Sequence, residues 1–148
     1  MRKFALALLL LTLGSGAAAQ SLPAVCEKGV EQLNVLKQYT ASIISSTRCI
    51  ESGALDRGNL AISYHNRASA KLLLWWYHLD PDTAEADEVL DSAYDDATQA
   101  VTLDPSYGKA FCMRGNILYN LSWGEAGGDD IDKGRSLGMR EEDCYLWD

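Results

Sequence analysis

Apolar residues recur every three or four positions along most of the chain, which is the spacing of one buried face of a helix. Residues 24–52 follow this pattern with one break, and Gly53 is placed to end the second helical segment. Residues 56–79 form a longer segment with a single apolar stripe. The chain has no alternating strand pattern and no Asn-Gly-type hairpin turn. We therefore expect an all-α protein of antiparallel helix pairs joined by short turns.

The next helical pattern begins at Asp80-Pro81. Pro81 suits a first helical turn, and Asp82 and Glu85 have the spacing of a capping box. The apolar stripe of this helix ends at Asp104-Pro105, and another stripe starts directly afterwards. Because proline cannot continue a helix, we interpret this break as the joint between two helix pairs.

Two parts of the chain align with later parts. Residues 61–70 (AISYHNRASA) align with residues 108–117 (GKAFCMRGNI): in both, an aromatic residue precedes an arginine by three positions, and a small residue follows the arginine. Residues 91–105 align in the same way with residues 125–139. The aligned pairs are Tyr64 and Phe111, Arg67 and Arg114, Ala68 and Gly115, Ala93 and Gly127, Ala97 and Ile131, Ala100 and Gly134, and Leu103 and Leu137.

With these residues the chain resembles the tetratricopeptide repeat, a helix–turn–helix unit of 34 residues. Its aromatic, small and proline positions are matched by Tyr64, Ala68, Ala93, Ala100 and Pro105, and in the following unit by Phe111, Gly115, Gly127 and Gly134. Ala97, Ile131 and Met139 depart from it. The resemblance implies a short solenoid of helical hairpins that stack to bury a continuous core.

The resemblance divides residues 20–148, a single domain, into four parts. Residues 23–56 are a degenerate repeat, residues 57–107 a repeat with a long hairpin insertion, residues 108–141 a further repeat, and residues 142–148 a tail. Between Ala68 and Ala93 lie roughly a dozen residues more than a 34-residue unit has. Both helices of this hairpin should therefore be about two turns longer than usual and project past their neighbours.

The N-terminus predicts export. Arg2 and Lys3 precede an apolar run over residues 4–13, and Ala17 and Ala19 have the spacing of a signal-peptidase site. We expect a signal peptide over residues 1–19, cleaved after Ala19 or one residue later, and a periplasmic or secreted protein. A membrane anchor is the alternative, but the run falls short of the roughly 20 residues that a spanning helix needs. No later segment is long and apolar enough to span a membrane.

Charge and cysteine content narrow the class further. A net charge of −8 without a basic stripe argues against a nucleic-acid partner. Four cysteines in an exported chain predict two disulfides among Cys26, Cys49, Cys112 and Cys144. Proximity in sequence favours Cys26–Cys49 and Cys112–Cys144, although all three pairings stay open. No CxxC motif is present and the chain has two histidines, so we expect no metal and no other cofactor.

The resemblance also implies where a partner would bind, because the inner helices of this family line a concave groove. The corresponding residues here are Glu27, Glu31, His65, Asn66, Ser69, Lys109, Asn116, Tyr119 and Asn120. One subgroup of the family grips a peptide's C-terminal carboxylate with basic residues and asparagines, and Asn66 and Lys109 stand where that clamp needs them. Glu27 and Glu31 stand where it needs a lysine and an asparagine, and Met113 replaces a basic residue, so the clamp is incomplete. A groove with this acidic rim would suit a basic or neutral segment. The alternative is a solvated face without a ligand.

A second candidate surface is the tip of the long hairpin, with Trp75, Trp76 and Tyr77 in succession. Successive residues cover different sides of a helix, so these rings cannot all face the core. They form either an exposed contact patch or packing against the partner helix and the N-terminal segment.

The chain lacks a Ser-His-Asp set, a phosphate loop and a zinc-protease motif, so we expect no catalytic residues. The predicted function is an exported protein-interaction module that binds a protein or peptide through its groove or its tip. A structural subunit of a cell-envelope assembly is the alternative, and a small envelope enzyme is the least expected. The sequence leaves the oligomeric state open.

Overall fold

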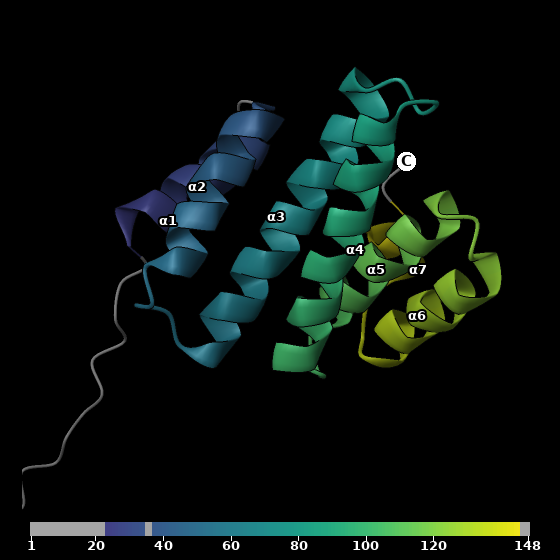
Figure 1. The fold of residues 1–148 in the computed structure, drawn as a ribbon. Helices are drawn as coiled ribbons and strands as arrows, with labels where there is room; N and C mark the ends of the chain where they lie inside the picture. The colour runs from purple at the N-terminus through teal and green to yellow at the C-terminus, as the bar shows by residue number, and fades with distance from the viewer. Residues whose placement is uncertain (1–22, 35–36, 146–148) are drawn as a thin grey trace, which may run out of the picture.

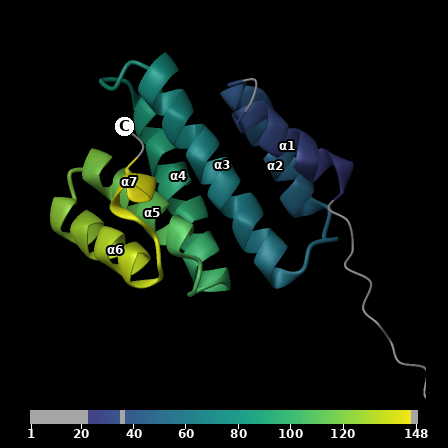
Figure 2. The same ribbon diagram turned by 180° about the vertical axis from the view of Figure 1, so that it is seen from behind.

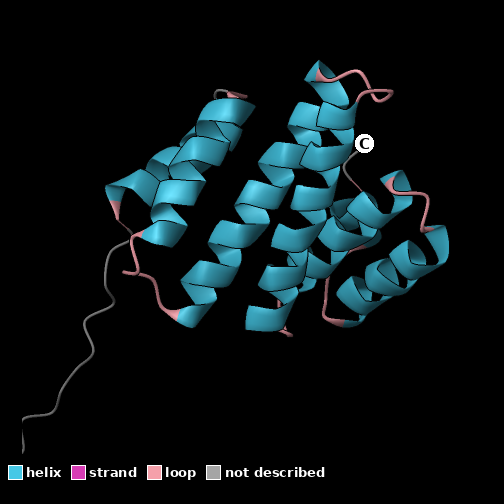
Figure 3. Cartoon of the chain, in the orientation of Figure 1, coloured by secondary structure: helices cyan, strands magenta, loops and turns pink. Residues whose placement is uncertain are grey.

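The computed structural model describes residues 23–34 and 37–145. The expected signal peptide and the last three residues of the expected tail lie outside them. All regular structure in the described residues is helical, which confirms the all-α prediction (Figures 1 and 3). The helices are α1 (Ala24–Asn34), α2 (Tyr39–Glu51), α3 (Arg57–His78), α4 (Ala84–Leu103), α5 (Gly108–Asn120), α6 (Gly124–Ser136) and α7 (Glu141–Cys144).

Successive helices pack as antiparallel pairs, α1 with α2, α3 with α4 and α5 with α6 (Figure 1). Adjacent pairs also pack on each other, α2 against α3 and α4 against α5. Seen from behind in Figure 2, α1, α3 and α5 lie on the viewer's side, and α7 lies across α5. No helix in the described residues is both long and apolar enough to cross a membrane.

The predicted long hairpin is present. Helix α3 has 22 residues and α4 has 20, whereas α2, α5 and α6 have 13 each. The turn end of this hairpin therefore rises past α5 and α6 (Figure 1). The predicted start of α4 was wrong: Pro81 lies in the preceding turn, and Thr83 caps the helix by accepting a hydrogen bond from the amide of Ala86. A threonine cap satisfies a free amide of the first turn, so the Asp82 and Glu85 pair is not needed.

The core forms where small residues let helices approach. Its largest cluster joins α3, α4 and α5 and consists of Ala68, Leu72, Leu90, Ala93, Ala97, Met113 and Ile117. The four alanines of the predicted α3–α4 crossing, including Ala100, are fully buried. Each buried methyl or larger apolar group adds stability in proportion to the area removed from water, about 25 cal/mol per Å².

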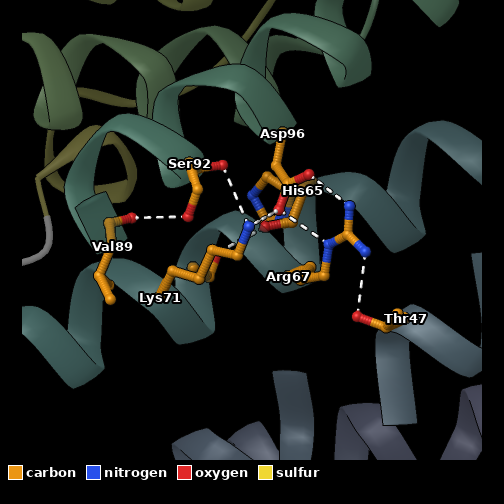
Figure 4. Close-up of polar contacts among 8 residues, drawn as sticks. Thr47, His65, Arg67, Lys71, Val89, Ser92 and Asp96 are labelled. Carbon is orange, nitrogen blue, oxygen red and sulfur yellow. Dashed lines mark hydrogen bonds and ion pairs between the residues drawn. The ribbon is translucent and has the colours of Figure 1, made fainter. Parts of the chain in front are cut away.

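The aligned parts of the chain make the same polar contact. Arg67 of α3 donates to both carboxylate oxygens of Asp96 on α4, at 2.8 and 2.6 Å (Figure 4). Its guanidinium lies over the Tyr64 ring. In α5 and α6, Arg114 donates to both oxygens of Asp130 at 2.6 and 2.8 Å and lies over Phe111. The two later hairpins thus share an aromatic–arginine–aspartate arrangement at aligned positions.

Candidate functional site

A cavity of about 460 Å³ is lined by described residues of α1, α2, α3, α5 and α7, together with Lys37. Helix α3 contributes more of these residues than any other element. The lining residues are Leu33, Asn34, Lys37, Tyr39, His65, Asn66, Ser69, Leu73, Tyr77, Lys109, Cys112, Met113, Asn116, Asp143 and Cys144. Four segments that are distant in sequence, residues 33–39, 65–77, 109–116 and 143–144, therefore converge on one site.

Five of the nine residues predicted for the groove line this cavity, namely His65, Asn66, Ser69, Lys109 and Asn116. The other four do not. Glu27 and Glu31 are exposed on α1, which contributes Leu33 and Asn34 from its last turn instead. Tyr119 faces α6, close to Gly127 and Gly128, and Asn120 donates to the backbone carbonyl of Asn116. Partner binding by any of these nine residues stays a prediction.

The C-terminal segment closes one end of the cavity. A disulfide joins Cys112 of α5 to Cys144 of α7, and a second joins Cys26 to Cys49, as proximity in sequence favoured. Asn116 is only 2% exposed, and its amide donates to the carbonyls of Cys112 and Cys144 at 2.8 and 2.6 Å. This amide holds α7 in place, so it has no free donor for a partner.

The histidine in the cavity wall is neutral near pH 7. Burial lowers the pKa of His65 from 6.5 to about 4, because the charged imidazolium is poorly solvated there. A hydrogen bond with Asn66 opposes this shift, and the charge of Lys109 adds to it. The His65 ring packs against Tyr107 with centroids 5.2 Å apart, and the Ser69 hydroxyl donates to the His65 carbonyl. His65 therefore contributes a neutral, packed imidazole to the lining of the cavity and not a positive charge.

The charge of the cavity differs from the acidic rim that we expected. Lys37 and Lys109 both line it. Among the described residues that line it, Asp143 is the one carboxylate, and Arg140 donates to its two oxygens at 2.7 and 2.9 Å. Helical spacing could not identify Lys37, because it lies in the turn before α2 with a positive φ of 52°. Lys109 was the cation that the sequence alignment did identify.

The three rings of the hairpin tip have different surroundings. Trp75 packs against the core cluster of α3, α4 and α5, whereas Trp76 is 47% exposed. Tyr77 is 62% exposed and stacks on Tyr39 of α2 with centroids 6.2 Å apart. Tyr77 also lines the cavity, so one tip residue belongs to the same site as the groove residues. The two candidate surfaces are therefore not fully separate.

A second hollow of about 460 Å³ adjoins the first and shares Lys37 and Tyr39 with it. Its remaining lining residues are Gln38, Thr40, Ala41, Leu74 and His78. This hollow is more apolar, since Tyr39, Ala41 and Leu74 form much of its wall. A polar cavity and an apolar hollow thus lie side by side.

Among residues 23–34 and 37–145, no group of three or more His, Cys, Asp or Glu side chains is placed to hold a metal ion. Comparison with models of known protein families gives no match, and no curated protein sequence matches the chain. The functional interpretation therefore depends on the site itself.

Proposed function

We propose that this protein is an exported interaction module of the tetratricopeptide type, which binds a segment of a partner protein in the cavity on its inner face. The observation that carries the proposal is that side chains of α3, including Tyr77 of the hairpin tip, and side chains of α5 line one cavity. Pockets that collect a few polar groups among apolar walls are the usual binding sites of proteins.

Three further features support this proposal. The shared aromatic–arginine–aspartate contact in the α3–α4 and α5–α6 hairpins is the arrangement that a repeated unit would have. Two disulfides fit an oxidising compartment, as expected for export. The imidazole ring of His65 hydrogen-bonds with Asn66 and, in the described residues, with no nucleophile or carboxylate, which favours binding over catalysis.

A bulky substitution in the cavity tests the proposal. Asn66→Trp would fill the cavity from α3, and Gln99→Trp would add the same ring on the exposed side of α4. Each protein is immobilised and exposed to an extract of the source cells, bound proteins are identified by mass spectrometry, and the affinity of each purified candidate is measured by calorimetry. We expect wild type and Gln99→Trp to bind one partner alike and Asn66→Trp to lose it. Equal binding by Asn66→Trp with an unchanged circular dichroism spectrum would contradict the proposal.

The alternative, an obligate subunit of an envelope assembly, makes a different prediction. Such a subunit has an interface that stays unsatisfied in the isolated chain, and it associates when purified. Light scattering coupled to size-exclusion chromatography measures this directly. A stable monomer that also binds the partner identified above excludes the obligate-subunit alternative.

A further inference from the structure

Five of the eleven lysines and arginines in the described residues form ion pairs. Arg67 and Lys71 bind Asp96, and Arg114 binds Asp130. Arg135 and Arg140 pair with carboxylates of α6 and α7. Lys37 and Lys109 make no ion pair with any described residue, and both line the cavity. A chain of net charge −8 thus places two unpaired cations at one site.

The nearby carboxylate does not cancel this charge. Arg140 binds both oxygens of Asp143, and this hydrogen bond, together with the charges of Arg140 and Lys109, lowers the pKa of Asp143. Arg140 pairs with both Asp143 and Glu142, and Lys37 and Lys109 are the two cations among the described residues that line the cavity. Charges in a partly enclosed cavity act more strongly than on open surface, because less water screens them.

Neutral groups in the cavity add hydrogen-bond donors. The Asn66 side-chain oxygen lies 3.3 Å from His65 Nδ1, whereas its NH₂ group has no hydrogen-bond partner among the described residues. An amide NH₂ offers two donors, and carboxylate and peptide carbonyl oxygens are the acceptors that such donors bind. Two lysines and one free amide donor group therefore face the same space.

From these features we infer that the cavity binds an acidic segment of the partner. Aspartate or glutamate side chains of that segment would lie between Lys37 and Lys109 and accept from Asn66. An adjacent apolar side chain would enter the hollow beside Leu74, since Lys37 and Tyr39 border both spaces. This inference rests on the proposed function and gives it a ligand class opposite in charge to that expected from Glu27 and Glu31. A basic segment would meet two unpaired lysines and a carboxylate that is already neutralised.

A peptide selection tests this inference. A library of random decapeptides, acetylated at the N-terminus and amidated at the C-terminus, is selected on the wild-type protein. We expect enrichment of peptides in which Asp or Glu adjoins Leu, Ile or Phe. Their dissociation constants should rise about tenfold in Lys37→Gln/Lys109→Gln, because two partly screened ion pairs are lost. The matched control, Lys28→Gln/Lys133→Gln, removes two exposed lysines that line neither space and should change affinity less than twofold.

The outcomes separate the two proposals. Selected peptides that are basic, or that bind both double variants equally, would overturn the acidic-segment inference and leave cavity binding standing. Failure to enrich any peptide on wild type above the Asn66→Trp protein would overturn both. Binding that appears only when the selected peptides carry a free C-terminal carboxylate would also overturn the inference, because the ligand would then be a chain end rather than acidic side chains.

Discussion

Where α3 crosses α4 the chain places Ala68, Ala93 and Ala100, and where α5 crosses α6 the aligned residues are Gly115, Gly127 and Gly134. A methyl group at Gly115 would lie 2.8 Å from the Gly127 carbonyl, and one at Gly127 would lie 2.9 Å from the Gly115 carbonyl. The α5–α6 hairpin is therefore in backbone-to-backbone contact, whereas alanine methyl groups separate α3 from α4. The aligned small residues therefore allow different contacts at the two crossings, backbone atoms in one hairpin and methyl groups in the other.

The α3–α4 and α5–α6 hairpins also differ in the number of helices that the contacts of their buried aspartate link. Asp96 binds Arg67 and Lys71, and Arg67 reaches Thr47 on α2 at 3.0 Å (Figure 4). Within the part of the chain that the structure describes, Asp130 binds Arg114 alone. In the α3–α4 hairpin the contacts of Asp96 and Arg67 thus join α2, α3 and α4, whereas in the α5–α6 hairpin Asp130 joins α5 and α6. The comparison leads us to expect that the same substitutions will have unequal effects in the two hairpins.

The largest expected effect is that of Asp96→Ala. Removing this carboxylate leaves two largely buried cations without the carboxylate that pairs with them, which costs about 3–5 kcal/mol of unfolding free energy. Asp130→Ala leaves one such cation and should cost less, about 2–3 kcal/mol. Urea unfolding followed by circular dichroism measures both. Equal losses, or a larger loss for Asp130→Ala, would contradict the difference that we draw between the hairpins.

Low pH should lower the unfolding free energy through His65 of the α3–α4 hairpin. The aligned residue of the α5–α6 hairpin is Cys112. The unfolded chain binds a proton below about pH 6.5 and the folded chain only near pH 4, so protonation favours unfolding between these values. Stability is fully present above pH 6.5 and is lost as the pH falls toward 4, by about 3 kcal/mol. His65→Gln removes this part of the pH dependence. Unfolding curves at pH 7.5 and 4.5 that shift equally for both proteins would refute the assignment.

Substitution of two α6 glycines tests the backbone-to-backbone contact between α5 and α6. Gly127→Ala should destabilise the protein by about 1–3 kcal/mol, because the added methyl group collides with the α5 backbone. Gly128→Ala is the matched control: its methyl group meets only the Tyr119 hydroxyl at 3.4 Å, so it should stabilise the helix by about 0.5–1 kcal/mol. Thermal denaturation distinguishes the two, and the interpretation fails if both substitutions have the same sign.

The smallest effect expected is that of Lys71→Leu. This substitution gives the α3–α4 hairpin a leucine at the position that aligns with Leu118 of the α5–α6 hairpin. It removes one hydrogen bond to the Ser92 carbonyl and one ion pair but adds buried apolar surface, so stability should change by less than about 1 kcal/mol. Combined with Asp96→Ala, it should reduce the cost of losing the aspartate toward that of Asp130→Ala. A double-mutant cycle measures this coupling, and additive losses would count against it.

Part of the site could be predicted because it lies on regular helices. The resemblance to the tetratricopeptide repeat implied His65, Asn66, Ser69 and Lys109 as groove residues, and all four line the cavity. It also implied Glu27, Glu31, Tyr119 and Asn120, which do not line the cavity. A helical period fixes which residues share a face of one helix but not how that helix is rotated against its neighbours.

By itself, the sequence determined the helices, the extra length of the α3–α4 hairpin and the aligned small residues, since these depend on the residues within one segment and on their spacing. Tertiary structure alone decided that Lys37 enters the cavity and that α7 covers Asn116. It also chose one of three possible disulfide pairings. These features are contacts between segments far apart in the chain, or depend on the conformation of a turn. No period within a single segment encodes them.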